Sequence, residues 1–160
     1  MSHPTLGLPP RDLRAGRPAD AAALRSAQSR VAARALEGAV GIDGTFRDRY
    51  DEVQLRELLA DLAAFTQRLS IAVASGDPAV MTSWAEAVAV RYRKRRVPMD
   101  DVVTMCEGLR RAAPAVVDPE AMATIDASLD AAIAVFKWHR RLAGDARKRH
   151  PLLDFIYKGA

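Results

Sequence analysis

The chain has few residues of the types that carry out chemistry, and they are widely spaced. Its three histidines are His3, His139 and His150. The last two are eleven residues apart, so they cannot both bind one metal ion from adjacent turns of a helix. No Glu-x-x-His motif is present, which argues against a ferritin-like di-metal bundle. His139 could serve as a haem ligand, but its neighbours are mostly cationic, and we expect an exposed histidine at a helix end.

The single cysteine, Cys106, lies on the apolar face of a predicted helix. We expect a buried, inert thiol there, because unpaired cysteines behave as small hydrophobic residues. Thiolate chemistry would require exposure and nearby positive charge. Arg110, one turn further on, supplies the charge, but the sequence does not establish the exposure.

Two pairs of carboxylates stand one helical turn apart, Asp48 with Glu52 and Asp126 with Asp130. Neither pair has the apolar surroundings that would raise a pKa for acid–base catalysis. A phosphate-binding glycine loop and a serine nucleophile elbow are also absent from the sequence. We therefore expect no enzyme activity and no cofactor.

Aromatic and methionine side chains offer a different chemistry, the binding of an apolar or tetrapyrrole-like ligand between helices. The candidate lining residues are Phe65, Trp84, Tyr92, Met105 and Phe136. The same side chains could equally form a filled core, and both interpretations stay open from the sequence alone.

The elements that position these residues are helices. The chain has 160 residues, of which 31 are alanine, 20 are arginine and only 4 are lysine, and alanine and arginine are strong helix formers. Apolar residues recur every three or four positions, which predicts an all-α protein, a globin-like or up-and-down bundle of about five helices with a long C-terminal helix. The predicted helices are 18–38, 52–74, 78–95, 99–112 and 119–147, with a glycine-rich loop over 38–44.

We expect three segments: a mobile tail over 1–17, one helical domain over 18–150, and an apolar tail over 151–160. The proline-rich start lacks helical periodicity. The final segment is rich in large apolar side chains and either folds back onto the bundle or docks into a partner or a larger assembly. Its candidate docking residues are Leu152, Leu153, Phe155, Ile156 and Tyr157.

The last predicted helix is apolar on two sides in its later half. One stripe faces the bundle, and the second consists of Val135, Trp138 and Leu142. We interpret the second stripe as the contact surface of a homodimer or of another protein.

The net charge of +4 divides unevenly along the chain. Basic residues concentrate at 91–96 and at 137–149. We interpret both clusters as solvated helix faces and helix C-termini, where cations are favoured, and the absence of any nucleic-acid module signature disfavours nucleic-acid binding. No apolar run approaches the roughly 18 residues of a membrane span, and the first residues lack the apolar core of a signal peptide. We therefore expect a cytoplasmic protein.

One stretch resembles a known family. It contains Trp84, the arginine run, the pair Val97-Pro98 and the sequence Gly-Leu-Arg-Arg-Ala at 108–112. Across residues 50–145 the chain resembles the N-terminal sensor domains of RsbR-type stressosome regulators. The resemblance implies a globin-like helical domain that binds no haem, forms dimers and relays a signal through its last helix. It implies no catalytic residues. No anti-sigma-antagonist-like domain is recognisable after residue 147, so we expect an unidentified regulatory protein to supply that output.

Overall fold

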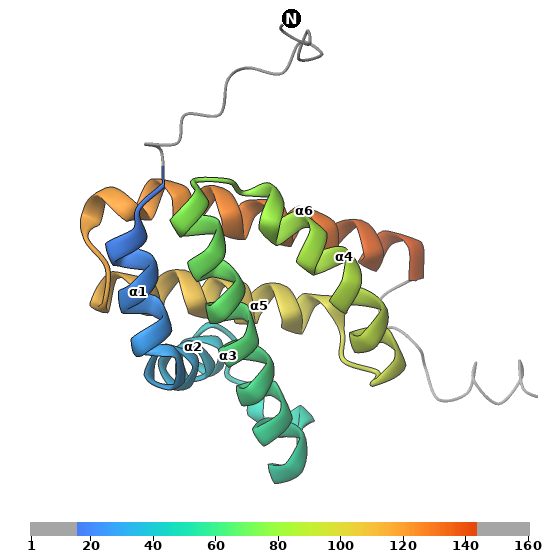
Figure 1. Cartoon of the computed structure of the whole chain (residues 1–160). Coiled ribbons are helices and arrows are strands. Elements are labelled where there is room, and N and C mark those ends of the chain that lie inside the picture. The colour runs from blue at the N-terminus through green and yellow to red at the C-terminus, as the bar shows by residue number, and fades with distance from the viewer. Residues whose placement is uncertain (1–15, 144–160) are drawn as a thin grey trace, which may run out of the picture.

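The computed structural model describes residues 16–143, and in that range the chain consists of helices joined by short loops, with no strand (Figure 1). The prediction of an all-α bundle with a long C-terminal helix is confirmed. The helices are α1 (Pro18–Ser26), α2 (Gln28–Ile42), α3 (Glu52–Ser75), α4 (Ala79–Lys94), α5 (Met99–Ala112) and α6 (Met122–Ala143). Single 3-10 turns occupy Arg47–Arg49, Ala113–Ala115 and Pro119–Ala121.

The helices pack in a crossed arrangement around one apolar core. α1 lies against α3, α2 lies against α5 and α3, and α6 lies against both α4 and α5. In Figure 1 α3 and α4 run across the front of α5 and α6. Aromatic side chains from α3, α4 and α6 meet in this core, so these three helices position the candidate site.

The prediction of a first helix over 18–38 is wrong in two respects. It divides at Ala27 into α1 and α2, and the second part continues to Ile42 through the segment predicted as a glycine loop. The division has a packing cause, because α1 packs on α3 while α2 packs on α5 as well as on α3. Gly38 lies within α2 where that helix crosses α5 closely: a Cβ atom on Gly38 would lie 3.2 Å from the Cα of Gly108.

The remaining predicted bounds agree with the structure to within a few residues, and local capping explains them. The Asp51 carboxylate accepts a hydrogen bond from the Gln54 amide at 2.8 Å, and the Gln54 side chain accepts one from the Asp51 amide at 2.9 Å. This reciprocal capping box fixes the start of α3. Gly76, with φ of 66°, ends the same helix in the left-handed conformation.

Parts of the predicted organisation lie outside the described residues. These parts are most of the 1–17 tail, the predicted helix beyond residue 143, and the whole apolar tail with Leu152, Leu153, Phe155, Ile156 and Tyr157. The start of the last predicted helix also differs from the prediction: a 3-10 turn at Pro119–Ala121 precedes α6.

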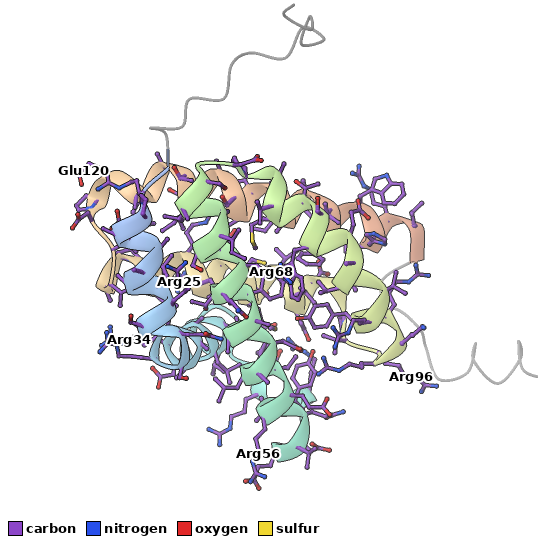
Figure 2. All side chains as sticks on the ribbon, viewed as in Figure 1. Arg25, Arg34, Arg56, Arg68, Arg96 and Glu120 are labelled. Atoms are coloured by element: carbon purple, nitrogen blue, oxygen red, sulfur yellow. The ribbon has the colours of Figure 1, made fainter. Side chains whose placement is uncertain are left out.

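The end of α4 carries an unusual residue. The amide of Val97 donates to the Tyr92 carbonyl at 2.9 Å and the amide of Arg96 donates to the Arg93 carbonyl at 3.1 Å. These two bonds form a Schellman motif, whose left-handed position glycine normally occupies. Here it is occupied by Arg96, with φ of 59°, at the tip of α4 (Figure 2).

Replacing Arg96 with glycine is therefore expected to stabilise the protein. The substitution removes a left-handed strain of about 1–2 kcal/mol, and the greater freedom of glycine in the unfolded chain offsets part of that gain. We expect a net gain of about 0.5–1 kcal/mol and a melting temperature higher by about 2–4 °C in a thermal unfolding experiment. Arg93→Gly, at an exposed helical position three residues earlier, is the control and should lower the melting temperature. An unchanged or lower melting temperature for Arg96→Gly would contradict the argument.

Candidate functional site

The five predicted pocket residues come together, but most of them pack on one another. Phe65, Tyr92, Met105 and Phe136 are buried, and Trp84 is partly buried. The ring centroid of Phe65 lies 6.2 Å from that of Trp84 and 6.0 Å from that of Phe136. The Tyr92 ring lies 6.4 Å from Phe136, nearly perpendicular to it. Tilted and edge-to-face contacts at these distances are typical of a filled aromatic core.

A cleft opens on the outer side of this aromatic core, between α3 and α4. Its volume is about 220 Å³. We call it the α3–α4 cleft, and its lining residues are Ala60, Asp61, Ala64, Trp84, Val88, Arg91, Tyr92 and Arg95. Trp84 and Tyr92 thus take part both in the core and in the wall of the cleft.

Charged groups lie at the cleft and beside it. In the cleft wall Arg95 donates to Asp61 at 2.7 Å and to Glu57 at 2.9 Å. Burial and the neighbouring Asp61 carboxylate raise the pKa of the Tyr92 phenol well above its usual value, so this ring stays neutral. The Arg68 guanidinium does not line the cleft, but it lies 4.9 Å from the centre of the Trp84 ring, and Figure 2 shows Arg68 on the side of α3 that faces α4.

The predicted contact stripe on α6 is only partly available to a partner. Trp138 is 48% exposed and Leu142 is 61% exposed. Val135 is 7% exposed, so the expectation that it belongs to the free face is wrong. Its side chain is already covered within the protomer, and the exposed part of the stripe is Trp138 with Leu142.

The expectation of an exposed His139 is also wrong. The ring is buried, and its Nε2 lies 3.0 Å from a carboxylate oxygen of Glu86 on α4. The Trp138 ring stands nearly perpendicular to the imidazole at 5.4 Å. One sequence signal could have indicated this burial, because His139 follows Phe136 by three residues on the inner face of α6.

One of the two carboxylate pairs considered for acid–base chemistry, Asp126 with Asp130, forms an ion cluster instead. Arg110 on α5 donates to Glu107 at 3.0 Å and to Asp126 at 2.7 Å, and its Nη2 donates to Asp130. Burial lowers the pKa of Arg110, but the hydrogen bonds to Asp126, Asp130 and Glu107 outweigh this and raise it. The cluster ties α5 to α6.

Cys106 is fully enclosed by the core, as expected. Burial raises the pKa of its thiol to about 12, with a smaller contribution from the Glu107 charge. At neutral pH the thiol therefore stays protonated, and it lacks the thiolate that nucleophilic or redox chemistry requires.

A further buried group escaped the sequence patterns. Asp101 is fully buried in the first turn of α5 and accepts hydrogen bonds from Arg49 Nε at 3.0 Å and Nη2 at 2.8 Å. The hydroxyl of Tyr50 also donates to it. Arg49 reaches Asp43 at 2.8 Å as well, and hydrogen bonds from Arg49 and Thr45 hold the pKa of Asp43 well below its ordinary value. The network anchors the α2–α3 connection on α5.

Two general features of the described part of the chain bear on the class of function. No group of three or more histidine, cysteine, aspartate or glutamate side chains within residues 16–143 could hold a metal ion. One helix in the same range, α3, is long and apolar enough to cross a membrane. It packs against α1, α2, α4 and α6, and a core helix of a soluble protein meets the same two conditions.

Comparison with known proteins adds no assignment: no protein-family model matches the chain, and no curated protein matches it.

Proposed function

We propose that this chain is a non-enzymatic helical sensor and protein-interaction module that acts in bacterial regulation as a homodimer. The observation that carries the proposal is the exposed pair Trp138 and Leu142, four residues apart on one side of α6. Large aromatic side chains are enriched at protein interfaces and depleted from free surfaces. The resemblance to RsbR-type sensor domains, which form dimers, points to the same kind of function.

A neighbouring apolar residue on α4 enlarges this surface. Val90 is 46% exposed. The hydrogen bond between Glu86 and His139 joins the two helices, one turn from Val90 on α4 and one turn from Leu142 on α6. We call Val90, Trp138 and Leu142 the α4–α6 face. We assign it to a second copy of the chain, because a two-fold axis pairs such a face with itself and buries each residue twice.

Trp138→Asp tests the proposed dimer. We expect the wild type to sediment as a dimer at tens of micromolar, and the variant to dissociate at least about 100-fold more readily. A buried tryptophan commonly contributes more than about 2 kcal/mol to an interface, and a two-fold interface contains it twice. Analytical ultracentrifugation over a concentration series measures the change.

Val53→Asp is the matched control, since Val53 is 62% exposed in the first turn of α3 and is not part of the α4–α6 face. It should leave the dimer intact. A monomeric wild type at tens of micromolar, or equal weakening by both substitutions, would exclude this proposal.

The ligand-binding alternative has one structural observation in its favour, the α3–α4 cleft. At about 220 Å³ the cleft is smaller than the roughly 300–1,000 Å³ of pockets for drug-sized ligands, so it suits a ligand smaller than a tetrapyrrole.

A further inference from the structure

The α3–α4 cleft owes its shape to two helix faces with contrasting side chains. On α3, Ala60, Ala64 and Arg68 follow one another at intervals of four residues, so they share one side of the helix. On α4, Trp84 and Val88 have the same spacing. The short alanine side chains leave a hollow opposite the larger residues of α4, which is the space of the cleft.

Trp84, one of the residues that line the cleft, has a hydrogen-bond donor that the protein does not use. Within the described part of the chain, the indole Nε1 of Trp84 is buried and has no hydrogen-bond partner. A buried donor without a partner is unfavourable, and most such groups in native proteins are paired with protein or bound molecules. The N–H group is covered by protein atoms, so an acceptor on a bound molecule reaches it only if the surrounding side chains shift.

The cations around the cleft are unequally neutralised. Arg95 is held by Asp61 and Glu57. In contrast, Arg91 lines the cleft and Arg68 covers the Trp84 ring, and neither has an ion pair with any residue in 16–143. The cleft therefore carries positive charge available to a ligand, beside apolar walls and two aromatic rings.

These features together select a ligand class. The unneutralised guanidinium group of Arg91 in the cleft wall, with that of Arg68 at the Trp84 ring, favours an anion with acceptor oxygens, and guanidinium groups match carboxylates well. The alanine, valine and tryptophan walls favour a flat apolar body, and the small volume limits it to one or two rings. We propose that the α3–α4 cleft is a binding site for a small aromatic carboxylate.

The site is independent of the proposed dimer, because its lining residues do not include the α4–α6 face. Its test uses the full chain and three probes of similar size: 1-naphthoate, the neutral 1-naphthamide, and the cationic 1-naphthylmethylammonium ion. Isothermal titration calorimetry measures binding, and sedimentation of the same samples reports the oligomeric state separately.

We expect saturable binding of 1-naphthoate at micromolar to low-millimolar concentration, at least about tenfold weaker binding of the amide, and weaker binding still of the cation. Ala64→Leu fills the hollow and should abolish binding. Arg91→Gln removes one cation at an exposed position and should weaken naphthoate binding about tenfold. Arg93→Gln removes an exposed cation that does not line the cleft and should leave binding unchanged.

Three outcomes would overturn the proposal. They are no saturation by 1-naphthoate up to millimolar concentration, equal affinity for the acid and the amide, and equal effects of Arg91→Gln and Arg93→Gln. Because Arg91 is an exposed residue, its substitution keeps the test decisive even if Ala64→Leu disturbs folding. A wild-type chain that is monomeric but still binds 1-naphthoate would contradict the proposed function and leave the proposed binding site intact.

Discussion

Replacing Gly108 with alanine is expected to lower the free energy of unfolding by about 3 kcal/mol or more. A Cβ atom at this position would lie 2.1 Å from the carbonyl oxygen of Ala35 and 3.2 Å from the amide nitrogen of Ala39. Both contacts are with the backbone of α2, so no side chain can turn aside to make room, and the whole helix must shift. Overpacking of this kind costs about 1–3 kcal/mol and sometimes more, which is a large share of the usual stability of a domain.

Urea unfolding measures the loss, and a second glycine provides the control. Gly41 lies in α2, the helix that Gly108 of α5 approaches, but a Cβ atom on Gly41 would meet nothing within 4 Å. Gly41→Ala should therefore stabilise the chain by about 0.5 kcal/mol through helix propensity alone. If Gly108→Ala and Gly41→Ala gave the same unfolding midpoint, the close crossing of α2 and α5 would not be present in solution.

Asp101→Asn is expected to produce the second large loss, about 3–5 kcal/mol. The substitution keeps the size of the side chain but removes the charge that two nitrogens of Arg49 and the Tyr50 hydroxyl contact. Removing one partner of a buried ion pair leaves the other charge poorly compensated, and this accounts for most of the expected loss. Chemical denaturation of the wild type and of the Asp101→Asn variant measures this loss of unfolding free energy.

The adjacent Asp100 offers a close comparison. It accepts a hydrogen bond from Arg140 at 2.6 Å in a more exposed position, and Asp100→Asn should cost less than about 1 kcal/mol. A loss below about 1 kcal/mol for Asp101→Asn as well would show that the buried network contributes little to stability.

Local patterns sufficed for most of the helices. The start of α3 follows from the Asp51 cap, its end from Gly76, and the bounds of α5 from Pro98 and the apolar repeat that follows it. The break at Ala27 could not be predicted, because alanine is the best helix former and only packing against two different helices divides the chain there. Gly38 led to the wrong prediction of a loop. The structure uses this glycine for the close approach of α2 to α5 and not for a turn.

The candidate site was less accessible from the sequence. The aromatic residues were found because their helical spacing is local, and the structure places their rings together. The ion pair between Arg49 and Asp101 joins residues 52 positions apart, and no pattern within one helix reveals it. The hollow of the α3–α4 cleft depends on small side chains, Ala60 and Ala64, which look like ordinary helix formers in the sequence.

The burial of Cys106 makes the protein well suited to site-specific labelling. It is the single cysteine of the chain, and its enclosed, protonated thiol should react very slowly with maleimides at neutral pH. A cysteine introduced at an exposed position such as Val53 would then be the one fast-reacting thiol. Spin labels or fluorophores attached there could report distances between two copies of the chain without any prior removal of native cysteines.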